Sequence, residues 1–361
     1  MPGPKNNTDL ADYAHGSAER LGVLLVNLGT PDDPHPPAVR RFLAEFLWDP
    51  RVIETPRWLW WLILHGVILR IRPSRSSHAY RQIWTEAGSP LMVHSRELAQ
   101  GLQEALDPAV SVELAMTYGS PSIASGLRKL RDAGVRRLLV LPLYPQYSGT
   151  TTASVFDRVS NELQRWRWLP EMRFVNEYHD DPAYISAVAA SIAAHWQVHG
   201  RRHLLFSFHS TPKRYLLAGD PYHCQCRKTA RLVTERLQLA PADWSISFQS
   251  RVGREEWLRP YTDELLVEYA AGKQLDLDVV CPGFAADNLE TLEEIEIRNR
   301  ELFLAKGGKS YHYIPALNAS DAHVDLMSHL VRRHMQGWTA KIDPVANEAS
   351  RVRALQAGAS R

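Results

Sequence analysis

The stretch His203-Leu-Leu-Phe-Ser-Phe-His-Ser-Thr-Pro212 decides the fold class of this chain. Its apolar run, broken only by Ser207, predicts a strand buried on both faces, as in parallel sheets covered by helices. The run stops at His209, and ligands of open α/β sheets bind just beyond the carboxyl ends of the strands. A lone histidine at a strand end is more often structural than catalytic. The case for His209 therefore depends on the rest of the chain.

The segment Leu21-Gly-Val-Leu-Leu-Val-Asn-Leu-Gly-Thr-Pro31 has the same plan, because an apolar strand again ends in a Thr-Pro turn. Aligning the two Thr-Pro pairs places Leu28 opposite His209. Two landmarks recur at one offset of 140 residues: Pro142 with Pro282, and Asp181 with Asp321. Strands and helices alternate in both halves, which predicts a duplicated α/β unit with parallel sheets and right-handed crossovers.

The expected architecture is two similar doubly wound, Rossmann-like α/β domains with a cleft between them. We place the first domain at residues 21–175 and the second at residues 176–335. Residues 34–90, rich in Pro, Arg and Trp, have no counterpart and are interpreted as an insertion in the first domain. We expect the tails, 1–20 and 343–361, to be flexible. No G-x-G-x-x-G motif follows the first strand, so a dinucleotide site is unsupported.

Composition narrows the class of protein. Apolar residues make up 45% of the 361 residues and charged residues 23%, which is typical of a soluble globular protein. Basic and acidic residues number 42 and 40, so no global field favours nucleic acid. The three cysteines form neither a disulfide framework nor a Cys-x-x-Cys zinc motif. Together with a polar amino terminus that lacks an export signal, they predict a cytoplasmic protein.

The longest apolar run is Trp58 to Leu69. Twelve residues are too few to cross a bilayer, which needs about 20. Two interpretations remain open: a buried helix, or an exposed apolar lip that contacts a membrane or an apolar ligand. Arginines at both edges, Arg57 and Arg70, suit the second interpretation.

Acidic residues follow another predicted strand end, in the stretch from Cys281 to Ile295. Asp287, Glu290 and Glu294 form either an acidic file that attracts a cation or passes protons, or simply favourable acids at a helix amino terminus. Combined with His209, one or two of these carboxylates make an incomplete nitrogen–oxygen site suited to a divalent transition metal. The same groups could act as base and proton relay. No H-E-x-x-H motif is present, so a permanently caged metal is not expected.

These stretches together closely resemble the ferrochelatase family. The resemblance spans roughly residues 21–330 in the right order, with these matching motifs: Leu25-Val-Asn-Leu-Gly-Thr-Pro31, Tyr144-Pro-Gln-Tyr-Ser148, Phe206-Ser-Phe-His-Ser-Thr-Pro212, Gly219-Asp-Pro-Tyr222, Phe248-Gln-Ser-Arg-Val-Gly253, Trp257-Leu-Arg-Pro-Tyr-Thr-Asp263 and Gly283 to Glu294.

The resemblance implies insertion of ferrous iron into protoporphyrin IX to form haem, with both as substrates. It implies that His209 binds the metal or accepts a pyrrole proton, that Glu290 is its partner carboxylate and metal ligand, and that Glu294 continues the acidic path. Segment 58–69 would be the lip through which porphyrin enters, with possible peripheral membrane contact. The porphyrin-binding residues that it implies are Leu28, Arg72, Tyr80, Ser89, Tyr147 and Trp257.

The chain departs from the family pattern at three positions. Asn288 stands where some relatives have His, and Thr117 replaces an expected Arg. Gly149 stands where cluster-bearing relatives have a Cys, so we expect no iron–sulfur cluster and no other permanently bound cofactor. The alternatives are a related chelatase that uses coproporphyrin or cobalt, and a non-catalytic haem or metal carrier. Basic residues around Arg72 and Arg75 would discriminate between porphyrins of different carboxylate number.

Overall fold

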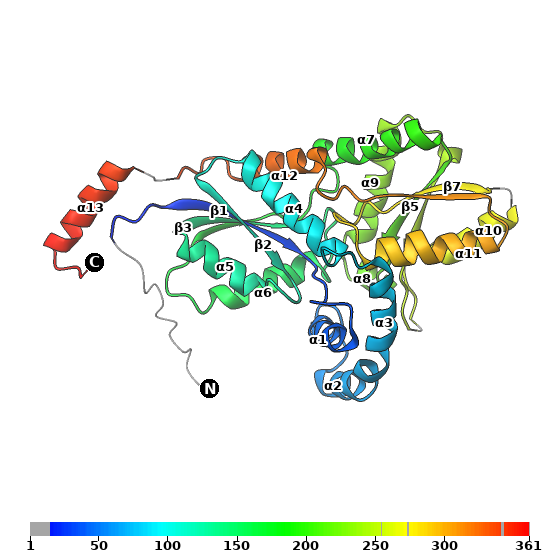
Figure 1. The fold of residues 1–361 in the computed structure, drawn as a ribbon, viewed down its shortest axis with the longest axis horizontal. Helices are drawn as coiled ribbons and strands as arrows, with labels where there is room; N and C mark the ends of the chain where they lie inside the picture. Colours follow the sequence, from blue (N-terminus) through cyan, green and yellow to red (C-terminus); the bar gives the residue numbers. More distant parts are fainter. Residues whose placement is uncertain (1–14, 254, 273, 341–342, 361) are drawn as a thin grey trace.

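The computed structural model describes residues 15–360 except 254, 273 and 341–342. The prediction of a flexible amino-terminal tail falls mostly on residues 1–14, outside the described residues. The remainder folds around two parallel sheets placed end to end, with a helical lobe at their junction (Figure 1).

The first sheet has the strand order β2-β1-β3-β4. Its strands are β1 (Arg20–Asn27), β2 (Val110–Met116), β3 (Val135–Pro142) and β4 (Glu171–Phe174). Alternate residues of β1 enter two different cores: Val23 and Leu25 pack with α4 (Pro90–Ala105), whereas Leu24 and Val26 pack with α5 (Ile123–Asp132) and α6 (Thr152–Leu163). Both faces of the sheet are therefore covered, which explains the unbroken apolar run of β1.

The second sheet repeats that order as β6-β5-β7-β8. Its strands are β5 (His203–His209), β6 (Trp244–Gln249), β7 (Asp276–Val280) and β8 (Ser310–Ile314). The helices of this half are α7 (Pro182–His199), α8 (Lys213–Leu217), α9 (Tyr222–Arg236), the 3₁₀ turn η2 (Pro241–Asp243), α10 (Thr262–Gly272), η3 (Glu290–Asn299), α11 (Arg300–Ala305) and α12 (Asp321–His334). The identical strand order confirms the duplicated α/β unit predicted from the sequence.

The equivalence of the two strand ends differs by one residue from the predicted one. Asn27 and His209 are each the last residue of their central strand, so strand ends match Asn27, rather than Leu28, with His209. The first half has one more residue before its Thr-Pro turn, and Gly29 turns there with φ 112°. A Cβ at Gly29 would lie 1.9 Å from the carbonyl oxygen of Tyr118, so only glycine fits this close approach.

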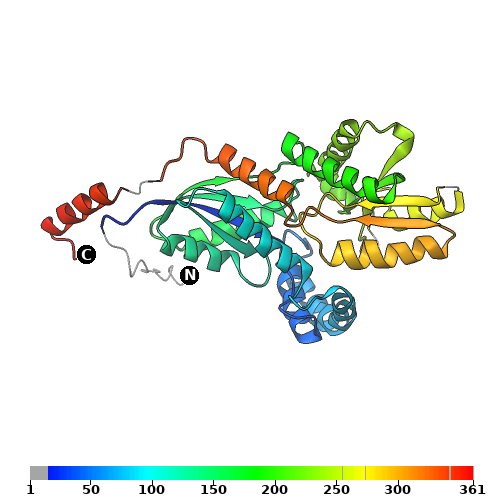
Figure 2. The ribbon, with the colours of Figure 1, turned by 45° about the horizontal axis from the view of Figure 1, so that its top comes forward.

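The insertion forms the helical lobe. It contains α1 (Pro36–Leu47), α2 (Arg57–Ile63), the π-helix η1 (Leu64–Ile68) and α3 (Leu69–Ile83), and it projects from the junction of the two sheets (Figure 2). Segment 58–69 has one buried face and one exposed apolar face, and contact of the exposed face with a membrane or an apolar ligand stays a prediction. Trp60, Leu64 and Leu69 are buried in a small core, whereas Trp58, Trp61, Leu62 and Val67 are more than half exposed.

The helix that carries the acidic residues begins as the π-helix η3 (Glu290–Asn299) and continues as the α-helix α11 (Arg300–Ala305). A ten-residue π-helix is unusual, since such turns mostly occur as single bulges at functional sites.

Helix α12 connects the two halves. It leaves the second sheet after β8 but packs against α4 of the first half as well as α7 (Figure 1). Gly101 of α4 permits this approach, because a Cβ there would lie 2.9 Å from Val324. Arg332 donates to the carbonyl of Ala105 at 2.9 Å. One continuous apolar core therefore runs through both halves.

The segment 343–361, for which the sequence predicts a flexible tail, contains helix α13 (Pro344–Gln356), capped by the Asp343 carboxylate. None of its residues is buried. Among the described residues, no helix has the length and apolar character needed to span a membrane.

Candidate active site

His209 occupies the carboxyl end of β5, the central strand of the second sheet. Its Nδ1 lies 2.6 Å from the carbonyl oxygen of Ser210. Because a carbonyl can only accept, Nδ1 carries a proton, and in the neutral ring Nε2 holds the lone pair. The imidazole is thus oriented by the backbone and presents one nitrogen as a ligand or base.

Glu290 begins η3, and its carboxyl group interacts electrostatically with three neighbours. Burial raises the pKa of Glu290 above its usual value; the His209 imidazole and the Arg72 guanidinium act in the opposite direction, while Glu294 raises the pKa further. The structure therefore brings His209, Glu294 and Arg72 together around Glu290. A carboxyl group that retains its proton closer to neutrality is suited to proton exchange.

Glu294 is oriented from the end of β6. The hydroxyl of Ser250 donates a short hydrogen bond to its carboxylate. Ser250 adopts a left-handed backbone with φ 68°, a conformation that is uncommon for a residue other than glycine. Strained residues of this kind cluster at functional sites.

Asp287, the third acid of the predicted file, has a structural environment. Its carboxylate accepts hydrogen bonds from Tyr313 Oη at 2.6 Å, Asn318 Nδ2 at 2.7 Å and Thr291 Oγ1 at 3.0 Å. These contacts fix the turn before η3. The cap of the first turn comes from Asn288, whose Oδ1 accepts the N–H groups of residues 290 and 291.

Tyr80, a predicted porphyrin residue of the insertion, lies beside the acid cluster, and Ser89 is connected to it through Thr30. Tyr80 is buried on α3; burial and the neighbouring Glu290 raise its pKa, and a hydrogen bond with Thr30 acts in the opposite direction. Thr30 donates to Ser89 Oγ at 2.8 Å. A chain of polar side chains therefore runs from the second half to the first, through Glu290, Tyr80, Thr30 and Ser89.

The other predicted porphyrin residues have different surroundings. Leu28 is half-buried and belongs to the apolar cluster of the lobe, together with Leu289 and Leu292 beside Glu290. The backbone of Trp257 pairs with Pro212, close to the end of β5. Tyr147 lines a pocket of about 500 Å³ together with Phe174, Asn176, Glu177, Pro221 and His334. None of the residues around His209 lines this pocket.

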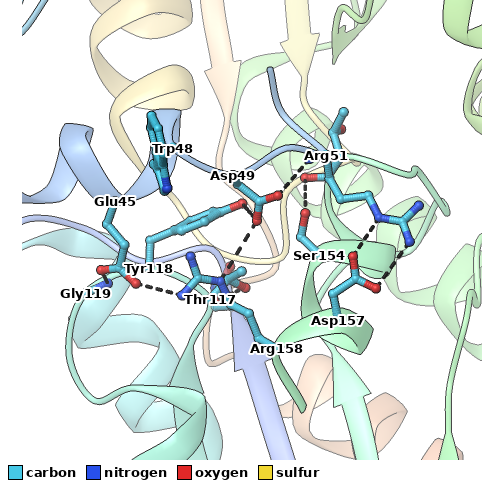
Figure 3. A network of polar contacts seen from close by, with 12 residues as sticks. Glu45, Trp48, Asp49, Arg51, Thr117, Tyr118, Gly119, Ser154, Asp157 and Arg158 are labelled. Carbon is cyan, nitrogen blue, oxygen red and sulfur yellow. Dashed lines mark hydrogen bonds and ion pairs between the residues drawn. The ribbon is translucent and has the colours of Figure 1, made fainter. Parts of the chain in front are cut away.

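Two further groups near the site were not singled out from the sequence. Gln249, the last residue of β6, joins the His209 strand to η3 and is described below; the strand-end rule could have indicated it. The second is the polar network that attaches the base of the lobe to the first half (Figure 3).

In this network the Tyr118 hydroxyl donates to Asp49 at 2.9 Å, and the Arg158 guanidinium bonds Glu45 at 2.7 Å. Arg51 binds Asp157 through two nitrogens. Thr117, where an Arg was expected, is buried beside this network (Figure 3), and its hydroxyl donates to the Asn27 carbonyl at 3.1 Å.

No group of three or more His, Cys, Asp or Glu side chains in the described part of the chain is arranged to hold a metal ion. His209 and Glu290 are two donors of suitable type, so a third ligand would come from the substrate or solvent. The three cysteines are free thiols; Cys226 and Cys281 are buried and Cys224 is exposed.

Comparison with known proteins gives one family. The ferrochelatase family model matches residues 20–335. The ferrochelatase of Thioalkalivibrio sulfidiphilus is 57% identical over 361 residues, 97% of this chain and 98% of that protein. That of Nitrosococcus oceani is 55% identical, with the same coverage. Among solved structures, SirB from Bacillus subtilis with Fe³⁺ has a TM-score of 0.55 at 12% identity over 88% of this chain and 96% of that chain, which is a likeness of fold.

Proposed function

The chain belongs to the ferrochelatase family of metal chelatases, and we propose that it inserts ferrous iron into protoporphyrin IX to form protohaem. The observation that carries this proposal is the His209–Glu290 pair at the strand end, whose charges act on each other, with Arg72 and Tyr80 of the lobe in electrostatic contact with Glu290. The rest of the proposal assigns roles to these residues.

Metal insertion requires two pyrrole protons to leave while the nitrogen lone pairs turn toward the ion. In the proposed mechanism, Leu28 and Trp257 hold the ring in a bent form, using binding energy from the rest of the macrocycle. Nε2 of His209 binds the incoming iron or accepts a pyrrole proton. Glu290 takes the proton onward, and Glu294, oriented by Ser250, transfers it toward solvent.

The raised pKa of Glu290 supports this relay. A carboxyl group of ordinary pKa is almost fully ionised near neutral pH, whereas a raised pKa increases the fraction that carries a proton and can release it. Iron is a substrate in this scheme and passes through the site.

Turnover with two porphyrins tests the proposal. Purified protein is incubated anaerobically with Fe²⁺ and either protoporphyrin IX or coproporphyrin, and metalloporphyrin formation is followed by absorbance. Faster turnover of protoporphyrin supports the proposal. Faster turnover of coproporphyrin, or a requirement for Co²⁺, identifies the related chelatases instead. Tight haem binding without turnover identifies a carrier.

We also propose that the protein is cytoplasmic and that the exposed face of segment 58–69 contacts a membrane surface. Trp58 and Trp61 are 71% and 51% exposed, next to arginines, which suits an interfacial site. Replacing both by Ser should reduce co-sedimentation with anionic lipid vesicles, whereas Trp168→Ser, which removes an exposed Trp elsewhere, should not. Equal loss in both variants would contradict specific contact.

A further inference from the structure

Gln249 lies between the two groups on which the proposed chemistry depends. It is the last residue of β6, is 2% exposed, and pairs with His209 in the sheet. Its carbonyl oxygen accepts the N–H of Ser210 at 2.7 Å. The backbone of Gln249 is therefore part of the strand end that carries the imidazole.

The side-chain amide of Gln249 has one defined orientation. Its Oε1 accepts a hydrogen bond from the Ser207 hydroxyl at 2.7 Å and a weaker one from the Cys281 thiol at 3.6 Å. Because these groups donate, the NH₂ group must face the other way. There it donates to the backbone carbonyl of Glu290 at 3.1 Å.

This contact ties the first residue of the π-helix to the His209 sheet. The N–H of Glu290 is held by Asn288, but Asn288 belongs to the same turn and cannot fix that turn relative to β5. Gln249 spans from one element to the other. An external bond to the first residue of η3 therefore restrains where Glu290 lies relative to β5.

We propose that Gln249 is a positioning residue that sets the separation between the His209 imidazole and the Glu290 carboxyl group. It touches neither ring nitrogens nor carboxylate, and it acts by holding the peptide that carries Glu290. The inference rests on the proposed proton relay for its effect on turnover, but the placement of Glu290 can be tested without turnover. A displacement of about 1 Å between reacting groups can reduce a rate about 100-fold.

Two substitutions of similar volume separate this role from simple packing. Gln249→Met removes the amide, and we expect kcat to fall about 10–100-fold while KM for the porphyrin stays unchanged. Gln249→Glu keeps the acceptor for Ser207 but donates to the Glu290 carbonyl only when its carboxyl group is protonated. That variant should approach wild-type kcat at low pH and lose activity as pH rises, whereas Gln249→Met should be impaired at every pH.

Gln103→Met provides the matched control. Gln103 also donates to a backbone carbonyl, Val110 O at 2.9 Å, and accepts from the N–H of Val112 at 2.8 Å, but it lies on α4 at the far end of the first sheet. We expect Gln103→Met to lower thermal stability about as much as Gln249→Met does, without altering kcat or its pH profile. If both variants lower kcat equally, Gln249 has only a structural role.

An independent readout is the crystal structure of Gln249→Met compared with that of the wild type. We expect the distance between the His209 imidazole and the Glu290 carboxyl group to increase in the variant, because the hydrogen bond that ties the Glu290 peptide to β6 is lost. An unchanged distance overturns the inference. Absence of chelatase turnover in the wild type would instead overturn the proposed function, and the two structures would still decide the placement of Glu290.

Discussion

The two sheets have the same strand order, yet their central strands end in opposite chemistry. β1 ends in Asn27, whose amide donates to Ser95 at 3.0 Å and whose Oδ1 accepts the N–H of Leu28. β5 ends in His209, which faces the raised-pKa carboxyl group of Glu290. The duplication thus preserved the scaffold, while titratable groups gathered at one end and neutral hydrogen-bonded groups at the other.

This difference matters for the proposed relay, in which protons must leave the site in one direction. If both halves carried ionisable strand ends, the buried charges would compete for the same protons and raise the cost of burial. The end of β1 is neutral, and in the proposed mechanism the adjacent Leu28 packs against the apolar macrocycle. The following changes test this division, beginning with the largest expected effect.

Removing the imidazole at the end of β5 should have the largest effect on metal insertion. In His209→Ala we expect the rate of metal insertion to fall about 10²–10⁴-fold, the range typical of a lost acid–base group. Porphyrin binding, measured by fluorescence quenching, should remain. Near-normal turnover in this variant would show that the chemistry does not depend on the β5 end.

Replacing Glu290 with a neutral side chain should lower activity but stabilise the protein. The folded-state pKa of Glu290 is raised, so ionising it disfavours the native state, and its contribution to the free energy of unfolding declines as pH rises from the unfolded pKa through the folded one. Glu290→Gln should therefore raise Tm at neutral and alkaline pH but scarcely at pH 4.

Thermal unfolding of both proteins across this pH range is the measurement. A Glu290→Gln variant that is less stable than the wild type at pH 8 would indicate that the carboxylate is stabilised in the native state, contrary to the prediction. The acid limb of the kcat profile should also be absent in this variant.

Removing the amide at the end of β1 should lower the stability of the protein more than its turnover rate. Asn27→Ala leaves the buried Ser95 hydroxyl and the Leu28 N–H without their partners, which should cost about 1–3 kcal/mol in the free energy of unfolding. Urea denaturation measures this, and we expect kcat to change less than about tenfold, with any effect appearing in KM. A larger loss in kcat than in Glu290→Gln would reverse the proposed division of roles.

Much of the architecture could be predicted from residue order alone. Both sheets are covered on two faces, so their strands are continuous apolar runs, and His209 ends one of them. The strand-end equivalence was offset by one residue because the turn at Gly29 depends on a contact with Tyr118, 89 residues away in sequence. The π-helix could not be distinguished from an α-helix, since both place Glu290 and Glu294 nearly on one face.

Contacts between segments that are distant in sequence could not be predicted either. The side-chain amide of Gln249 is oriented by Ser207, Cys281 and Glu290, which come from three different elements. The packing of α12 on α4 likewise depends on Gly101, a position that looks like an ordinary, slightly unfavourable helix residue.

The path of α12 has a consequence for how the chain is made. The first sheet is translated early, but the helix that completes the cover of α4 emerges from the ribosome only with residues 321–334. Domains usually fold in the order of their synthesis. We therefore expect the face of α4 around Gly101, which contacts Val324 in the complete protein, to stay uncovered until almost the whole chain has left the exit tunnel. Fragments that end before residue 321 should therefore depend on chaperones and be prone to aggregate.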